Sequence, residues 1–337
     1  MYHFIYFTNL PSFYKVNLFN RISEHRKILV IFTGRTANIR NSDFFSSNLN
    51  FDYISLGGQK ALNKLYITCK VIRNNYYEEL IVTGVNDWIS WLCIFLSPVR
   101  KNATVVESSY HEATISGIRG FLKSIFFKRI SVTYASGKSQ EKLARLHKFN
   151  GKIIITKGVG VFNVVKQPQY IPSKKVENFI YVGRLSSEKN LKFLITVFNK
   201  LPNYNLHIVG YGPEELELRD LSKENVKFHG AVDNKSLFVL YQSCDVFILP
   251  SQKEPWGLVV EEALNNGLPV LVSNKVGCAE EIVQENYNGL VFDYSSESSL
   301  LAKIERIVDP DFYNLLKKNI SKIDFNEIIN YQVDCYL

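Results

Sequence analysis

The chain has 337 residues, a net charge of +8, 46% hydrophobic residues and five cysteines. This length exceeds one ordinary core and fits two domains of about 150 residues each. Residues 1–170 hold 23 Lys and Arg against 9 Asp and Glu, a net +14, whereas residues 171–337 have a net −6. The first half is therefore expected to face something anionic: nucleic acid, an anionic membrane surface or a phosphorylated acceptor.

The composition excludes several classes of protein. The cysteines are odd in number and scattered, without CxxC or Cys/His spacing, which favours a reducing cytosol and argues against a structural zinc. The stretch from Met1 to Phe7 lacks a basic region and a cleavage site, so it predicts a first strand and not a signal peptide. The longest apolar run, from Ile89 to Val99, falls short of the roughly 20 residues of a membrane span.

Short apolar strands alternate with longer helical stretches along the whole chain. The first half predicts strands at 3–8, 27–32, 80–82, 103–106, 131–134 and 152–155. The second half predicts strands at 179–182, 205–209, 226–229, 246–249, 269–272 and 289–292. A polar, proline-containing stretch between Lys166 and Asn178 predicts a linker. The fold expected is α/β, with a Rossmann-like parallel-sheet domain over 1–167, a second over 168–322, and a last helix over 323–337 that crosses back to the first domain.

Charged residues and glycines follow the predicted strands of the second half. Arg184 and Lys189 leave the carboxyl end of strand 179–182, where ligands bind in open α/β sheets, and both suit a diphosphate. Two solvated charges on a loop are the alternative. Gly210 and Gly212 begin like a dinucleotide fingerprint, but Glu215 replaces its third glycine. This pattern predicts a tight turn close to a ligand and makes an NAD site improbable.

Two acids, Glu254 and Glu262, stand eight positions apart just before and within an apolar helical stretch. If Trp256, Gly257 and Leu258 turn into a helix, their backbone N–H groups form an anion site. One acid could then hold a sugar and the other a ribose. The alternative is a helix-terminal carboxylate and a solvated one.

These motifs have the order and the gaps of a known family. Together with segments 228–230, 240–251 and 263–270, they make the chain resemble glycosyltransferase family 4, the group 1 glycosyl transferases of the GT-B fold, of the bacterial surface-polysaccharide type. Residues 179–292 match densely and the first half only loosely. The resemblance implies retaining transfer of a sugar from a nucleotide-diphosphate sugar to a hydroxyl of a glycan or glycolipid in polysaccharide, lipopolysaccharide or capsule biosynthesis. The nucleotide sugar is a co-substrate, and no cofactor or metal is implied.

The resemblance also implies a role for each residue. Arg184 and Lys189 neutralise the diphosphate of the donor, Glu262 binds the ribose and Glu254 the donor sugar. Backbone N–H groups at Trp256, Gly257 and Leu258 grip the sugar or the distal phosphate. Gly210 and Gly212 form the turn beside the donor, and His111 reaches the donor sugar or orients the acceptor.

Two positions depart from the family pattern. Pro255-Trp256 stands where a small residue and phenylalanine are commoner, so the identity of the donor is open. The loop after the first strand lacks the glycine pair that many relatives use at the donor phosphate, and Lys15 is the candidate replacement.

Residues 115–130 mix apolar and basic side chains, as in a helix that lies in a membrane interface or one that packs on its own sheet. The expected partners are the donor, a glycan or lipid-linked glycan acceptor and an anionic membrane at its cytoplasmic face, and no nucleic acid, because no binding motif accompanies the charge. Asp309-Pro310-Asp311 has the DxD form of metal-dependent transferases, but helix capping explains it. A nucleotide-sugar epimerase or hydrolase on the same scaffold, or a non-catalytic glycan-binding protein, are the alternatives.

Overall fold

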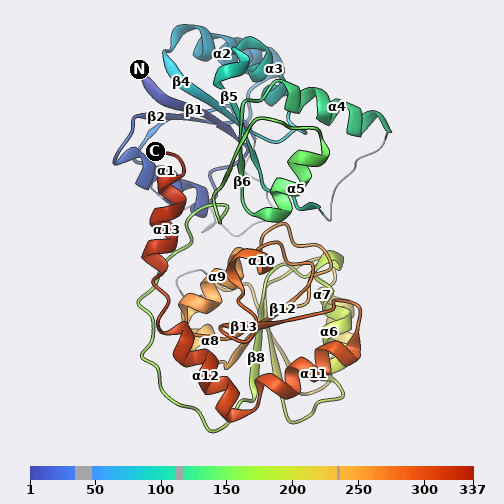
Figure 1. Cartoon of the computed structure of the whole chain (residues 1–337). Helices are drawn as coiled ribbons and strands as arrows, with labels where there is room; N and C mark the ends of the chain where they lie inside the picture. Colours follow the sequence, from blue (N-terminus) through green and yellow to red (C-terminus); the bar gives the residue numbers. More distant parts are fainter. Residues whose placement is uncertain (35–47, 111–116, 234–235) are drawn as a thin grey trace. The chain divides into compact units, whose positions relative to one another are not determined.

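The computed structural model describes residues 1–34, 48–110, 117–233 and 236–337. The chain forms two compact units, one of Met1–Val161 with Asn326–Leu337 and the other of Phe162–Phe325. Each unit contains one parallel sheet with helices on its faces (Figure 1). The units divide between Val161 and Phe162. The boundary predicted from the sequence lies six residues later, between residues 167 and 168.

The first unit contains a seven-stranded parallel sheet in the order β3-β2-β1-β4-β5-β6-β7. Its strands are β1 (Tyr2–Thr8), β2 (Ile28–Phe32), β3 (Asp52–Ser55), β4 (Tyr77–Thr83), β5 (Asn102–Val106), β6 (Val132–Ala135) and β7 (Lys152–Ile155). Its helices are α1 (Phe13–Ser23), α2 (Ala61–Asn74), α3 (Trp88–Leu96), α4 (Gly117–Lys128), α5 (Lys138–Leu146), α13 (Phe325–Asp334) and the short 3-10 turn η2 (Val99–Lys101). Strand β3 was not predicted, because it is an exposed edge strand with polar residues at both ends.

Apolar strands hold the core of this unit together. Strands β2 and β5 are buried along their whole length, which is typical of a sheet covered on both faces. Helix α4 is anchored only at its carboxyl end, where Phe126 and Phe127 pack into the core. At the end of the chain, Tyr336 stacks on Tyr134 with ring centroids 4.5 Å apart.

The second unit contains a six-stranded parallel sheet in the order β10-β9-β8-β11-β12-β13. Its strands are β8 (Asn178–Val182), β9 (Asn205–Val209), β10 (Val226–Gly230), β11 (Val246–Leu249), β12 (Val270–Ser273) and β13 (Gly289–Phe292). Its helices are the 3-10 turn η4 (Ser187–Lys189), α6 (Leu191–Phe198), α7 (Glu215–Leu221), α8 (Leu237–Gln242), α9 (Leu258–Asn265), α10 (Ala279–Ile282), α11 (Glu297–Ile307) and α12 (Pro310–Ile320).

The order of strands reverses beside the first strand of each sheet, between β1 and β4 and between β8 and β11. Loops that leave the carboxyl ends of strands on either side of such a point diverge, and the crevice between them is where open α/β sheets bind ligands. The loops after β8 and β11 therefore form the expected donor crevice of the second unit.

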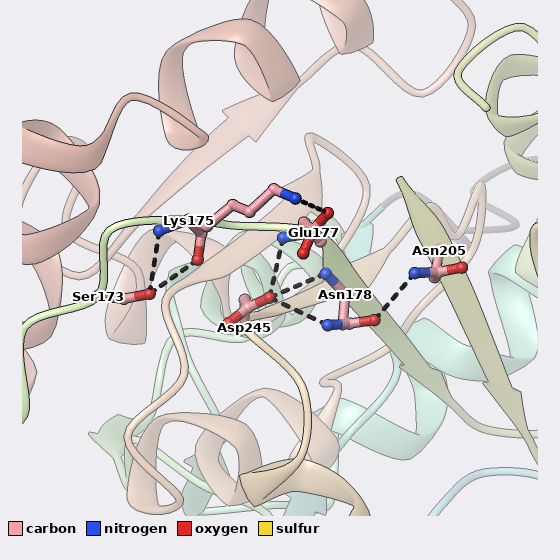
Figure 2. Close-up of polar contacts among 6 residues, drawn as sticks. All are labelled: Ser173, Lys175, Glu177, Asn178, Asn205 and Asp245. Atoms are coloured by element: carbon pink, nitrogen blue, oxygen red, sulfur yellow. Dashed lines mark hydrogen bonds and ion pairs between the residues drawn. The ribbon is translucent and has the colours of Figure 1, made fainter. Parts of the chain in front are cut away.

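The other ends of β8 and β11 are pinned by one carboxylate (Figure 2). Asp245 Oδ2 accepts from the backbone N–H groups of Glu177 at 2.9 Å and Asn178 at 2.8 Å. The backbone N–H of Asp245 donates in turn to the Asn178 carbonyl at 2.8 Å. The Asn178 side chain extends the contact to Asn205 on β9, at 3.1 Å. This network fixes the register of three neighbouring strands.

The DxD sequence caps a helix, as expected. Asp309 accepts from the backbone N–H of Phe312 at 2.8 Å, and Pro310 stands in the first turn of α12.

We predict that Asp245→Ala lowers the free energy of unfolding of the second unit by about 1–3 kcal/mol, because two half-buried N–H donors lose their acceptor. Urea unfolding measures the change. Asp220→Ala, on the exposed face of α7, is the matched control and should leave the midpoint unchanged. If the two variants unfold at the same urea concentration, Asp245 does not hold the strands.

Candidate functional site

Two of the predicted charged residues meet at the carboxyl edge of the second sheet. The Lys189 ammonium, on η4 after β8, pairs with Glu254 Oε2 in the loop after β11. Ser251 Oγ donates to the same oxygen at 3.3 Å. The two loops are also joined by their backbones, since the Gln252 N–H donates to the Glu188 carbonyl at 2.9 Å. The pair thus spans the point where the order of strands reverses.

Arg184 lies on the same loop and is exposed. Its carbonyl accepts from the Tyr181 hydroxyl at 2.8 Å, and in the described parts of the chain its guanidinium makes no ion pair. Burial raises the pKa of Tyr181 well above its usual value, and the charges of Glu254 and Glu188 raise it further. The phenol therefore stays a hydrogen-bond donor. Partial burial raises the pKa of Glu188, but other groups outweigh this effect. The hydrogen bond from the Ser186 hydroxyl at 2.6 Å and the charges of Lys189 and Arg184 leave the pKa below its usual value.

Gly210 and Gly212 bring the loop after β9 against the loop after β8. A Cβ on Gly210, whose φ is +133°, would lie 1.9 Å from the Gly183 carbonyl oxygen. A Cβ on Gly212 would lie 2.3 Å from the Leu185 carbonyl oxygen. Contact between two backbones thus explains why these positions lack a side chain.

The turn that carries Glu254 is held by the loop after β12. The backbone N–H of Gly277 donates to the Glu254 carbonyl at 2.8 Å, and that of Cys278 to the Trp256 carbonyl at 2.8 Å. Gly257 ends the turn at φ +98° and precedes α9, as a glycine can without strain. The first-turn N–H groups of α9, beginning at Leu258, therefore start next to Glu254.

The side chain of Trp256 lies inside the unit, away from solvent. Its indole, 3% exposed, donates to Glu261 Oε2 at 2.8 Å, and Glu261 is 2% exposed. Burial raises the pKa of Glu261 to about 8. The hydrogen bond from the indole lowers this pKa, and the charge of Glu262 raises it. Only the backbone of Trp256 is left to contact a ligand. Sequence reasoning missed this bond, because it noted the tryptophan at position 256 but had no signal for the burial of Glu261.

Glu262 follows on α9, where it is half-buried. Burial raises its pKa to about 7, and the buried Tyr241 hydroxyl of α8 opposes this shift. Glu262 makes no hydrogen bond or ion pair with Lys189 or Glu254 in the described part of the chain, so it stands outside the charged pair.

A cavity of about 330 Å³ opens at the corresponding edge of the first unit, and we call it the inner pocket. It is lined by the ends of β1, β4 and β5 and by residues of α1, α4 and α5. Lys15, the candidate phosphate contact, is buried there and pairs with Glu107 at 2.9 Å. His147 is 2% exposed and lies parallel to the Phe127 ring, and its Nε2 has no hydrogen-bond partner among the residues that the structure describes. Burial and the charge of Lys123 lower the pKa of His147, so its imidazole is neutral near pH 7.

A second, outer groove of about 790 Å³ continues from the inner pocket along α4. The two cavities share Val85, Asn86, Ser108, Lys123 and Leu143. Trp91, Arg119 and Leu122 line the outer groove alone. Sequence reasoning missed both cavities, because their residues come from segments far apart in the chain.

The predicted residue His111 lies outside the described residues. Within the described ranges, no three His, Cys, Asp or Glu side chains gather as a metal site.

Comparisons with known proteins agree on one family. The sequence model of the family described as "Glycosyl transferases group 1" matches residues 165–322. The O-antigen biosynthesis glycosyltransferase WbnH of Escherichia coli is 34% identical over 272 residues, which cover 78% of this chain and 76% of that protein.

Solved structures match nearly the full length of the chain. The lipopolysaccharide outer core galactosyltransferase WaaB, in its apo form, has a TM-score of 0.73 at 14% identity and covers 98% of both chains. HepE of Anabaena, solved with UDP and glucose, has a TM-score of 0.69 at 15% identity and the same coverage. At such identities the likeness shows the fold, which is GT-B. Because WbnH is more than 30% identical over more than two thirds of the chain, the protein belongs to the group 1 glycosyl transferases.

Proposed function

We propose that the protein is a retaining glycosyltransferase that moves a sugar from a nucleotide-diphosphate sugar to a hydroxyl of a glycan or glycolipid during assembly of a bacterial surface polysaccharide. The observation that carries the proposal is the gathering of Arg184, Lys189 and Glu254 at the reversal point of the second sheet. The O-antigen and lipopolysaccharide enzymes among the similar proteins support the pathway, and HepE with UDP supports the class of donor.

The cations suit the chemistry of the leaving group. The donor diphosphate gains negative charge as the glycosidic bond breaks, and fixed cations stabilise that charge without reorganisation. Arg184 is exposed and forms no ion pair in the described chain, so it is ready to bind phosphate. Lys189 would exchange Glu254 for a phosphate oxygen when the donor binds. That exchange would free Glu254 to accept hydrogen bonds from the donor sugar.

The neighbouring groups complete the donor site. Glu262 would accept from the ribose hydroxyls, and the backbone N–H groups at Trp256, Gly257 and Leu258 would hold the sugar or the distal phosphate, as helix starts do. Gly210 and Gly212 would form the wall beside the donor, since their backbone lies directly against the loop of Arg184.

Retention needs no carboxylate nucleophile in this arrangement. The acceptor hydroxyl attacks the anomeric carbon on the face that the phosphate leaves, and a phosphate oxygen takes the hydroxyl proton. The bond between the anomeric carbon and the phosphate oxygen breaks as the new glycosidic bond forms. Arg184 and Lys189 supply the positive charge that a metal ion gives in other transferases.

The inner pocket is the proposed place for the acceptor, because it lies at the ligand-binding edge of the first unit. His147 Nε2 is a buried group that a sugar hydroxyl could satisfy. His111 stays a candidate for contact with the donor sugar or the acceptor, on the resemblance alone.

Helix α4 supports peripheral binding at the cytoplasmic face of a membrane. Ile118 and Phe121 at its start are 80% and 67% exposed, beside Arg119 and Lys123, whereas its other end is packed in the core. Apolar and basic residues together favour an anionic interface. Within the described residues, every helix is too short or too polar to span a bilayer.

We predict that Lys189→Ala, Arg184→Ala and Glu254→Gln each lower kcat/KM for transfer by about 10²–10³, as the loss of one transition-state contact does. A thermal-shift screen of nucleotide sugars first identifies the donor. Lys192→Ala, an exposed lysine of α6, is the matched control. Donor consumption is followed with and without glycan acceptors. Normal turnover in a variant removes that residue from the mechanism, and equal consumption without any acceptor favours a hydrolase or epimerase.

We predict that donor affinity rises with pH between about 6 and 8. Ribose hydroxyls need carboxylate oxygens as acceptors, and the pKa of Glu262 near 7 leaves much of it protonated at the lower end of this range. The dissociation constant of the nucleotide sugar, measured by calorimetry across the range, should fall, whereas Glu262→Gln should bind weakly with a flat profile. Parallel pH profiles for the two proteins would exclude Glu262 from ribose binding.

We predict that the protein co-sediments with anionic liposomes and stays in the supernatant with neutral ones. Phe121→Glu should release it, because the substitution places a charge on the exposed apolar end of α4. Leu315→Glu, at an exposed apolar position of α12, is the control. Equal recovery of the protein in the supernatant with both lipids would contradict binding to an anionic membrane.

A further inference from the structure

Two cations on α4 face one groove without a counter-charge. Arg119 and Lys123 stand four residues apart, so they lie on the same side of the helix and repel each other. Among the described residues, no carboxylate lines the outer groove and neither side chain forms an ion pair. The groove therefore holds two positive charges that a ligand can neutralise.

The inner pocket differs from the groove in charge. Glu107, the one carboxylate among its described lining residues, is neutralised by Lys15 at 2.9 Å, and the buried His147 is neutral near pH 7. The remaining lining mixes small polar groups with Phe127, Leu143 and the strand ends. Lys123 lines both cavities. Apart from this shared cation, the described lining of the inner pocket is polar without net charge, and it opens into the doubly cationic groove. Such a pair of cavities fits a sugar joined to an anion.

The outer groove also has an apolar part. Trp91 lines it from α3, and Leu122, 43% exposed, lines it from α4. The exposed Phe121 precedes Leu122 on the same helix. The two connected cavities thus combine a polar pocket with a groove that is lined by two cations and by apolar side chains.

We propose that the acceptor is a glycosyl phosphate or diphosphate. Its sugar occupies the inner pocket beside His147, its phosphate groups bind Arg119 and Lys123, and its aglycone lies on Trp91 and Leu122. Four residues rise about 6 Å along a helix, a separation that long basic side chains can close around one or two phosphates. The proposal rests on the proposed function, since it names the substrate of the acceptor side.

Isothermal titration calorimetry on the full chain tests the anion site with farnesyl diphosphate, inorganic diphosphate and farnesol as probes. Saturating UDP keeps Arg184 and Lys189 occupied, so that the diphosphates report on the first unit. We expect farnesyl diphosphate to bind, and Arg119→Ala with Lys123→Ala to weaken it at least about tenfold. Lys128→Ala, an exposed lysine of α4 outside both cavities, should bind as the wild type does.

The charge-preserving variant Arg119→Lys with Lys123→Arg separates lost charge from lost structure, and it should restore most of the affinity. Farnesyl diphosphate that binds more tightly than inorganic diphosphate supports a lipid-linked acceptor, and equal affinity supports a soluble glycosyl phosphate. The proposal is overturned if the double alanine variant keeps wild-type affinity, or if farnesol binds as tightly as farnesyl diphosphate.

Failure of the proposed function gives a different result. A wild-type protein that binds neither UDP nor any nucleotide sugar contradicts the donor site alone. The farnesyl diphosphate titration, repeated without UDP in the Arg184→Ala and Lys189→Ala background, still measures the contribution of Arg119 and Lys123.

Discussion

The pairing of β8 with β11 is the constraint on which the proposed donor site depends. At the amino ends of these strands Asp245 ties the two backbones together, and at the carboxyl ends Lys189 meets Glu254. The register between them places Phe179 opposite Val246. A slip of one residue would turn every side chain to the other face and separate the charged pair. The hydrogen bonds of Asp245, at the opposite ends of the strands, therefore help to fix the positions of Lys189 and Glu254.

The bond between Trp256 and Glu261 is a local constraint on the same geometry. A buried carboxyl without partners is costly, and the indole N–H satisfies one of its oxygens. The bond ties the turn of Glu254 to the first turn of α9. Phenylalanine at position 256 could fill the same space but could not donate a hydrogen bond. The tryptophan at this position is therefore suited to the buried carboxyl of Glu261. The departure from the family pattern is thus explained by packing, and not by a new contact with the donor sugar.

The sequence predicted most of the fold because the strands of a covered parallel sheet are continuous apolar runs. Residues 205–209, 246–249 and 289–292 coincide with β9, β11 and β13. The exposed edge strand β3 has no such run and was missed. Motif order also assigned Lys189 and Glu254 to one site, since both residues follow neighbouring strands, but it did not predict their direct ion pair. The Trp256–Glu261 bond and the two cavities were out of reach, because side-chain direction and distant contacts leave no periodic signal. The structure does not describe His111, and its role stays a prediction.

The charge of the first half illustrates why composition predicts the sign of a partner's charge but not the site where the partner binds. Several cations there serve the fold: Lys15 pairs with Glu107, Lys101 donates to the Tyr77 carbonyl, and Arg129 donates to the Ile94 carbonyl at 3.0 Å. Such groups are satisfied before any ligand arrives. Arg119 and Lys123 share a groove whose described lining offers them no carboxylate. An anionic ligand gains more binding free energy from those two cations than from many that are already paired. The distribution of counter-charges, and not the net charge of +14, therefore indicates where an anion would bind.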